Sequence, residues 1–300
     1  MPTTQPLTAT FGVEVTDLDL RDVVSREDFA PLRDLFEAHS ALLFRRQSIT
    51  DDDHFRLASY FGEIEDRLKD ERKPGAKVEI PLVSNQTETG VTGEMDLHTL
   101  NLRANQQWHT DSTFLPRPAL CNILTARVVP SRGGETELAS SRAAWAAMPE
   151  ALKARVRGRF FAHHYRTSRA RLSEELASLP MFNKWPAQTW PALWTNPTNG
   201  AEALYIASHV YAVDGLDAEA SAALIDELTA FCAQPAFTYS HAWTVGDVLL
   251  WDQRAVLHRG RPWPLEEPRT LASLCISMSD GDGLAAARAA VEARAEGDQA

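Results

Sequence analysis

The stretch GDVLLWDQRAVLHRG at residues 246–260, followed by TLASLCIS at residues 270–277, decides the predicted fold. Both contain short apolar runs bounded by turn or charged residues, as buried strands do. Further short runs of this type occur at residues 122–129, 136–139, 159–165 and 237–242. They follow one another without regular crossover helices, which disfavours a parallel βαβ fold. The sequence therefore predicts a mostly β, α+β fold: an antiparallel double-sheet jelly roll with flanking helices.

Helical patterns surround these strands. They are expected at residues 25–39, 50–61, 140–156 and 216–232. The first two begin with Ser25 and Thr50, residue types that cap helix N-termini. Residues 86–101 are polar and aperiodic and are a candidate lid. No internal repeat is present, so residues 1–283 are expected to form a single domain, with residues 284–300 as a frayed helix or disordered tail.

The composition disfavours several classes of protein. Among 300 residues, 30 Lys and Arg stand against 41 Asp and Glu, a net charge of -11 that disfavours a nucleic-acid partner. Three widely separated cysteines suit neither a disulfide framework nor a zinc ribbon. The first ten residues lack the pattern of a secretory signal, and no run is apolar enough to span a membrane. We therefore expect a cytoplasmic protein with no membrane partner.

A metal site is predicted from three residues. His109 and Asp111 are two positions apart in an expected strand, so both side chains would lie on one face. His258 ends a distant apolar run that a rolled sheet can bring close. Two histidines and one carboxylate leave coordination positions open, as in non-haem Fe(II) oxygenases. Arg269 precedes the apolar run 270–277, where a buried cation needs an anion: either a bound carboxylate or an internal salt bridge.

These residues resemble a known family. His109-x-Asp111, His258 and Arg269, together with Gly133-Gly134-Glu135-Thr136, are similar to the taurine dioxygenase/2,4-dichlorophenoxyacetate dioxygenase family of Fe(II)- and 2-oxoglutarate-dependent dioxygenases. The segments WHTDSTF and GDVLLWDQRAVLHRG agree with it in type, order and spacing. The resemblance runs from GVEVTDLDL, residues 12–20, to about residue 279, and is greatest to the aryloxyalkanoate dioxygenases.

The resemblance implies a double-stranded β-helix that uses Fe(II), 2-oxoglutarate and O2 to hydroxylate a small organic substrate, releasing succinate and CO2. His109, Asp111 and His258 would be the catalytic iron ligands. Arg269 and the Thr136 hydroxyl would bind the distal carboxylate of 2-oxoglutarate, and Trp251 would pack beside it. Family members are commonly homo-oligomers. The substrate could be an aryloxyalkanoate, whose hydroxylation beside the ether oxygen cleaves the ether bond.

One position departs from the family pattern. Many members carry a second arginine four residues after the first, where it holds the substrate's acidic group; here that position is Ser273. Either other cations hold an acidic substrate, or the substrate is neutral; a sulfonated compound is a further alternative. The candidate substrate residues are Ser273 itself and Lys69, Arg72, Lys73, Arg103 and His209, of which His209 is preferred because it follows an apolar strand.

Two readings of a different class stay open at this point. A zinc hydrolase could use the same two histidines and aspartate, with metal-bound water as nucleophile. A non-catalytic jelly-roll binding module could hold them as an internal hydrogen-bond network. Neither requires Arg269 or Thr136.

Overall fold

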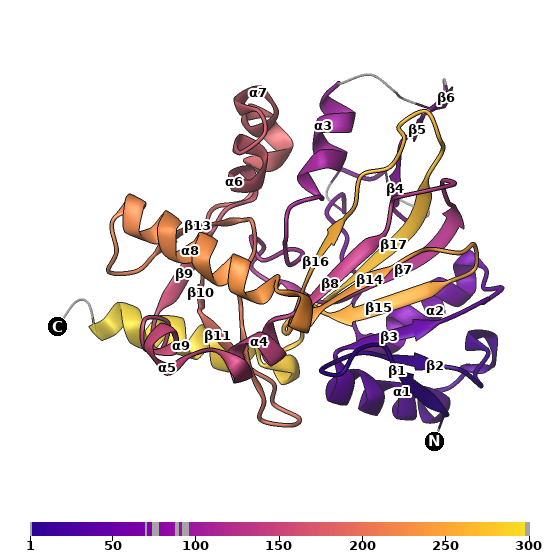
Figure 1. Ribbon diagram of the computed structural model, residues 1–300, viewed down its shortest axis with the longest axis horizontal. Helices are drawn as coiled ribbons and strands as arrows, with labels where there is room; N and C mark the ends of the chain where they lie inside the picture. Colours follow the sequence, from indigo (N-terminus) through magenta and orange to yellow (C-terminus); the bar gives the residue numbers. More distant parts are fainter. Residues whose placement is uncertain (1, 70, 74–77, 88–89, 92–95, 298–300) are drawn as a thin grey trace.

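A seven-stranded sheet lies at the centre of the computed structural model, which describes residues 2–69, 71–73, 78–87, 90–91 and 96–297 (Figure 1). Its strands, in spatial order, are β1 (Thr4–Pro6), β2 (Val13–Val15), β3 (Ala41–Phe44), β15 (Val248–Asp252), β7 (Ala119–Val128), β17 (Thr270–Ser277) and β4 (Leu82–Ser84). Neighbouring strands are antiparallel except β2 and β3, which are parallel.

A smaller antiparallel sheet faces this one. It consists of β14 (Thr238–His241), β8 (Thr136–Ser140) and β16 (Val256–Gly260). Leu138 and Val256 of this sheet belong to one core cluster with side chains of the larger sheet: Leu43, Leu124, Leu249, Trp251 and Leu271. Most of the short strands predicted from the sequence thus form two sheets with an apolar layer between them, whereas the run at 159–165 contributes β9 (Phe160–His163) to a separate sheet.

Two helices cover the other face of the large sheet, α1 (Arg26–His39) and α2 (Asp51–Phe61) (Figure 1). Successive side chains of a strand point to opposite faces. Accordingly, Val248 and Leu250 of β15 pack with residues of α1 and α2, whereas Leu249 and Trp251 pack toward the smaller sheet. Ser25 and Thr50 cap these helices through reciprocal capping boxes, as their positions in the sequence predict.

The remaining elements extend the fold at one side and one end. The strands are β9 (Phe160–His163), β10 (Gln188–Pro191), β11 (Leu193–Thr195), β12 (Glu202–Leu204), β13 (Val210–Val213), β5 (Gln86–Thr87) and β6 (Gly90–Val91). The helices are α3 (Leu97–Ala104), α4 (Ser141–Ala147), α5 (Glu150–Ala154), α6 (Tyr165–Ala170), α7 (Glu174–Ser178), α8 (Ala218–Cys232) and α9 (Leu284–Gly297). Short 3₁₀ turns occur at Leu20–Asp22, Pro180–Phe182, Pro235–Phe237 and Asp280–Asp282. Figure 1 shows α3, α6 and α7 grouped at one end of the molecule.

The predicted mixture of strands and flanking helices is confirmed, but helices contribute more than a mostly β fold implies. The helix expected at 140–156 is two helices, α4 and α5, because Pro149 cannot continue the first one. The expected aperiodic segment 86–101 ends in helix α3; its residues 88–89 and 92–95 lie outside the described part, and its role as a lid stays a prediction.

The C-terminal segment is helical over Leu284–Gly297, and Leu284 and Ala287 are buried in the main core cluster. Its first turns are therefore docked rather than frayed. The single-domain boundary at residue 283 stays a prediction. Across the described residues, no helix has both the length and the apolar character needed to cross a bilayer.

A buried ion network connects the turn between β15 and β16 to helix α1. Arg254, 2% exposed, donates from Nη2 to Glu37 Oε2 at 2.7 Å and from Nε to Asp252 Oδ1 at 2.8 Å. Arg33 joins the network through Glu37 and Asp282, both at 2.7 Å. Because Arg254 is paired on two sides, the turn has a fixed position relative to α1.

Replacing Glu37 tests this network. Glu37→Gln is expected to lower the free energy of unfolding at neutral pH by about 3 kcal/mol, because the buried Arg254 and the half-buried Arg33 lose a charged partner. Burial alone would raise the pKa of Glu37, but Arg254 and Arg33 hold it below its ordinary 4.5. The stabilisation is therefore complete above about pH 4.5 and is lost as the pH falls through the lowered folded-state pKa. Urea unfolding across this range should show the difference from wild type shrinking in acid.

The matched control is Glu227→Gln, which removes the acid of an exposed pair with Arg155. That change should cost less than about 1 kcal/mol. Equal effects of the two substitutions would contradict a structural role for the buried network.

Candidate active site

His109 and His258 are brought together by backbone pairing. The two residues form an isolated antiparallel bridge, with N–H···O distances of 3.0 Å and 2.8 Å between their main chains. The expected strand around Trp108–Ser112 is not formed: the chain makes this one bridge and then turns, with Ser112 in the left-handed region at φ 58°. The turn, rather than strand periodicity, carries Asp111 back toward both histidines.

The three predicted ligands converge. One ligand atom from each of His109, Asp111 and His258 lies within 4.8 Å of the others. Nε2 of His109 is 3.7 Å from Asp111 Oδ1, and Nε2 of His258 is 3.5 Å from Asp111 Oδ2. The arrangement fits a divalent metal held by two imidazoles and one carboxylate, with further positions open.

The protonation states also fit a metal ion. Burial lowers the pKa of His258 to about 3 and that of His109 below its ordinary value, so both imidazoles are neutral at pH 7. Burial would raise the pKa of Asp111, but the neighbouring histidines and a hydrogen bond from Asn122 lower it to about 2. His109 Nδ1 lies 2.8 Å from the Gln107 carbonyl, which requires the proton on Nδ1 and leaves the Nε2 lone pair for a metal.

Asp111 is oriented by two side-chain amides from neighbouring elements. Gln253, in the turn between β15 and β16, donates from Nε2 to Asp111 Oδ2 at 2.7 Å and accepts from the Asp111 N–H at 3.0 Å. Asn122 on β7 donates to the same Oδ2 at 2.9 Å. Ser273 donates in turn to Asn122 Oδ1 at 3.0 Å. Gln253 and Asn122 could not be predicted from the sequence, since neither amide carries a spacing signal of its own.

Arg269 and Thr136 line the same cavity of about 990 Å³ as the three ligands. Arg269 is 3% exposed, and its Nε and Nη2 both donate to the Gly134 carbonyl at 3.0 and 2.9 Å. A Cβ at Gly134 would lie 2.9 Å from Arg269 Nε, so the glycine permits the approach. Burial lowers the pKa of Arg269 to about 10. Its Nη1 has no acceptor among the described residues, and this fits an arginine whose remaining donors bind an anionic ligand.

Thr136 and Trp251 differ in their access to this cavity. The Thr136 hydroxyl oxygen accepts the Trp243 indole N–H at 3.0 Å, so its own proton is free to be donated into the cavity. Trp251 is fully buried and does not line the cavity; its ring lies 4.6 Å from that of His258. Because side chains alternate between the two faces of β15, Trp251 points into the layer between the sheets. Its ring packs against the His258 imidazole from within that layer.

The predicted substrate cations have separate locations. Lys73 and Arg103 are exposed and outside the cavity, and Lys69 lines only a smaller pocket beside it. Arg72 lines the cavity but forms a bidentate pair with Asp66 at 2.6 and 2.9 Å. None of these four cations is therefore both unpaired and inside the cavity.

Ser273 and His209 do lie at the cavity. Ser273 is occupied by its bond to Asn122. His209 is 2% exposed, and its ring is 6.3 Å from that of His109. Burial moves the pKa of His209 well below its ordinary value, so this imidazole carries no charge at neutral pH.

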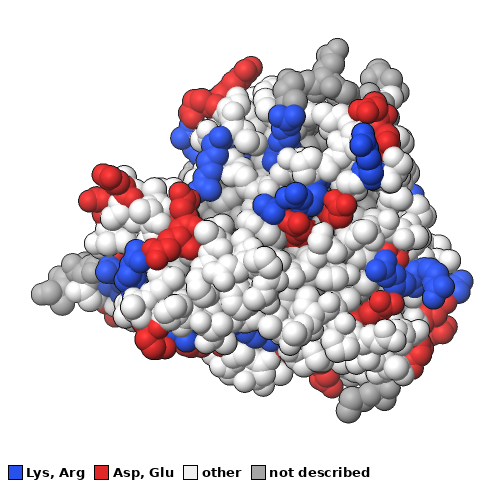
Figure 2. Space-filling model, viewed as in Figure 1, with Lys and Arg blue, Asp and Glu red and all other residues white. Residues whose placement is uncertain are grey.

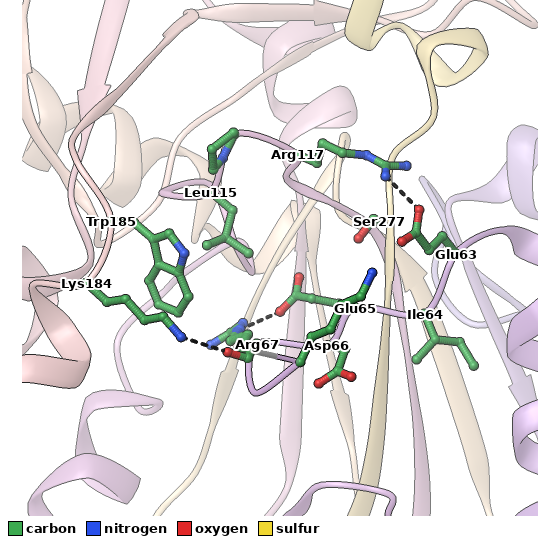
Figure 3. Close-up of a pocket in the computed structure, with 12 residues that line it drawn as sticks. Glu63, Ile64, Glu65, Asp66, Arg67, Leu115, Arg117, Lys184, Trp185 and Ser277 are labelled. Atoms are coloured by element: carbon green, nitrogen blue, oxygen red, sulfur yellow. Dashed lines mark hydrogen bonds and ion pairs between the residues drawn. The ribbon is translucent and has the colours of Figure 1, made fainter. Parts of the chain in front are cut away.

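Two cavity arginines were not predicted, Arg67 and Arg169. Arg67 begins a highly charged stretch of the sequence, yet its side chain turns inward: it pairs with Glu65 and donates to Ser112 Oγ at 2.8 Å. Figure 3 shows Arg67 facing Glu65 in the smaller pocket, whose wall it shares with the main cavity. Arg169 lies on α6, one helical turn after Tyr165; this i, i+4 spacing was the only signal in the sequence that they share a face.

Comparison with known proteins shows the family of this chain. The model of the family described as "Taurine catabolism dioxygenase TauD, TfdA family" matches residues 3–275. The chain belongs to this family. The predicted family and enzyme class are therefore confirmed, and the zinc-hydrolase and binding-module readings are not supported.

Individual relatives cover nearly the whole chain. The α-ketoglutarate-dependent 2,4-dichlorophenoxyacetate dioxygenase of Cupriavidus pinatubonensis is 33% identical over 270 residues, covering 89% of this chain and 94% of that protein. The (S)-phenoxypropionate/α-ketoglutarate dioxygenase of Sphingobium herbicidovorans is 32% identical, covering 89% and 91%. The crystal structure of AAD-2 with Mn(II) and N-oxalylglycine superposes with a TM-score of 0.84 at 27% identity, covering 93% and 98%.

The orientation of Asp111 by Gln253 can be tested by metal binding. Gln253→Leu is expected to weaken Mn(II) binding about 10- to 100-fold, because Asp111 loses a hydrogen bond to each of two groups. Titration calorimetry of the purified enzyme measures the affinity. Gln234→Leu, at an exposed position, is the control and should bind Mn(II) like wild type. Unchanged affinity in Gln253→Leu would show that Asn122 alone orients the carboxylate.

Proposed function

We propose that the protein is an Fe(II)- and 2-oxoglutarate-dependent dioxygenase that hydroxylates aryloxyalkanoic acids at the carbon beside the ether oxygen. The enzyme uses Fe(II), 2-oxoglutarate and O2, the set expected from the sequence. The observation that carries the proposal is one cavity that joins the His109, Asp111 and His258 cluster to a buried, unpaired Arg269 and an aromatic wall. We also infer that the two facing sheets are the predicted double-stranded β-helix, which the superposition on AAD-2 supports.

Each residue has a defined task in this proposal. His109, Asp111 and His258 hold the iron, which supplies the activation of O2 for oxidative decarboxylation of 2-oxoglutarate and hydroxylation of a substrate C–H bond. The guanidinium of Arg269 binds the distal carboxylate of 2-oxoglutarate, and the Thr136 hydroxyl donates to it. Trp251 packs behind His258 and holds that imidazole in position.

The cavity wall suits an aryl group. Phe114 and Tyr165 stack with their ring centroids 3.8 Å apart, and Trp185 lies 5.9 Å from Phe114. The walls also contain aliphatic side chains such as Ile80 and Leu124. An aromatic ring can pack against this surface while its side chain reaches the metal cluster. Hydroxylation of an aryloxyacetate beside the oxygen yields a hemiacetal, which breaks down to a phenol and glyoxylate, with succinate and CO2 as coproducts.

The other expectations from the sequence are part of the same proposal. We propose a cytoplasmic homo-oligomer that acts on a small molecule, without nucleic-acid or membrane partners. The net charge of -11 supports this view of the partners, since it opposes binding to polyanions. Light scattering coupled to gel filtration measures the oligomeric state, and a monomer would refute that part of the proposal.

A substrate panel tests the reaction. Aryloxyacetates and 2-aryloxypropionates should give succinate and a phenol in equal amounts, whereas neutral aryl ethers and aryl sulfonates should give succinate at least about tenfold more slowly. Phenol release is followed by absorbance and succinate by chromatography. Faster turnover of the neutral ethers would favour the alternative that Ser273 marks a neutral substrate.

Arg269→Met is expected to raise the KM for 2-oxoglutarate by about 100-fold, the effect of losing a charge-assisted bidentate contact. The KM for the aryl substrate should change far less. Arg261→Met, at an exposed position in the preceding loop, serves as the control. A normal 2-oxoglutarate KM in Arg269→Met would remove Arg269 from the cosubstrate site.

A further inference from the structure

Charge pairing distinguishes two arginines from the exposed ones. On the face shown in Figure 2, basic and acidic residues lie next to one another. Among the ion pairs of the molecule, the exposed Arg155 and Arg157 pair with Glu227 and Glu150 at 2.6 and 2.8 Å. Arg169 and Arg269 are only 5% and 3% exposed, yet no described Asp or Glu forms an ion pair with either. Both line the cavity that holds the metal cluster.

The surroundings of Arg169 leave most of its donors unused. Nη1 donates to Ser168 Oγ at 2.8 Å and Nη2 to Asn101 Oδ1 at 3.0 Å, while Nε is buried without a partner. A guanidinium has five N–H donors, so three remain. The ring of Tyr165 lies 4.5 Å from the guanidinium carbon. A buried guanidinium without an acid is unfavourable unless an anionic ligand completes it.

Arg169 lines the cavity that holds the metal cluster, and a series of ring contacts connects the two. Tyr165, which it covers, lies 5.8 Å from the ring of His209, and His209 lies 6.3 Å from the ring of His109. The same Tyr165 stacks on Phe114, so the cation and the aromatic wall are adjacent. In an aryloxyacetate, the carboxylate is attached to the carbon that is oxidised. Its anchor must therefore lie in the cavity that joins the metal cluster to the aryl pocket, and Arg169 lines that cavity.

Other cavity groups are less suited to bind an acid. Arg67 is paired with Glu65, Arg72 with Asp66, and Ser273 with Asn122. His209 is neutral at pH 7, because burial holds its pKa well below the ordinary value. Arg269 is already assigned to the distal carboxylate of 2-oxoglutarate. Two buried, unpaired guanidiniums thus match the two anionic molecules that the proposed reaction requires.

We propose that Arg169 binds the carboxylate of the organic substrate, in the role that a second arginine at position 273 would have filled. The inference rests on the proposed function, because it assumes an acidic aryloxy substrate. Nη1 and Nη2 each use one hydrogen on a protein acceptor, so each keeps a second hydrogen that can donate to a carboxylate oxygen. The aryl ring then packs along Phe114 and Tyr165. Arg169 is therefore a specificity-determining residue, selecting acids over neutral aryl ethers.

Steady-state kinetics of the iron-loaded enzyme test the anchor. Arg169→Met should raise the KM for an aryloxyacetate about 100-fold or more, leave the 2-oxoglutarate KM within about twofold, and leave turnover of the corresponding methyl ester unchanged. Arg169→Lys should restore part of the affinity for the acid, since lysine supplies the positive charge but not the planar, bidentate guanidinium. Arg171→Met, an exposed position at the end of the same helix, is the matched control and should resemble wild type.

A purely structural role for Arg169 makes different predictions. If Arg169 were purely structural, Arg169→Met would reduce turnover of the acid and of the ester alike and would lower the melting temperature. Removal of a buried charge that lacks an acidic partner should instead leave the melting temperature unchanged or higher. If Arg169→Met does not fold, Arg169→Gln is measured in its place under the same criteria. If wild type oxidises the acid and the variant keeps its acid KM, the anchor is overturned and the proposed function stands. If wild type oxidises only the ester, both are overturned.

Discussion

The site depends on keeping Asp111 ionised in a half-buried position between two neutral imidazoles. Among the described residues no Lys or Arg forms an ion pair with this carboxylate, so the hydrogen bonds from Gln253 and Asn122 must stabilise its charge at neutral pH. Each amide comes from a different part of the two facing sheets, and both must be in register for the carboxylate to be held. The packing of the sheets is therefore a condition for metal binding as well as for stability.

The sequence Asp252-Gln253-Arg254 shows how closely fold and site are joined. Asp252 pairs with Arg254 and accepts its main-chain N–H, Arg254 reaches Glu37 on α1, and Gln253 between them contacts Asp111. A single turn thus anchors a helix on one side and a metal ligand on the other. The cavity side of the molecule has the opposite character, since Arg169 and Arg269 keep donors that have no partner in the described part of the chain. Such groups favour ligand binding at the expense of stability.

How far the sequence predicts the structure depends on the kind of signal. His109, Asp111, His258 and Arg269 could be found because their spacing and apolar context match a family pattern, and the short strands because their apolar runs are distinct. Arg169 and Arg67 could not, because long cations in polar segments resemble exposed residues until tertiary packing turns them inward. The pairing of His109 with His258 was likewise invisible, since one bridge between distant residues leaves no periodicity. The helix break at Pro149 follows from local chemistry alone, because proline disrupts a continuing helix.

The placement of α6 among the short helices at one end of the molecule has an evolutionary consequence. Of the proposed cosubstrate and metal residues, His258 lies on β16, His109 is paired with it and Arg269 directly precedes β17, so a substitution there disturbs register and core together. Arg169 lies instead on a helix of six residues that belongs to neither of the two facing sheets. Mutations in this helix can reshape the cavity wall while iron and cosubstrate binding stay intact. Substrate range can therefore diverge among descendants of this enzyme without loss of the oxidative chemistry.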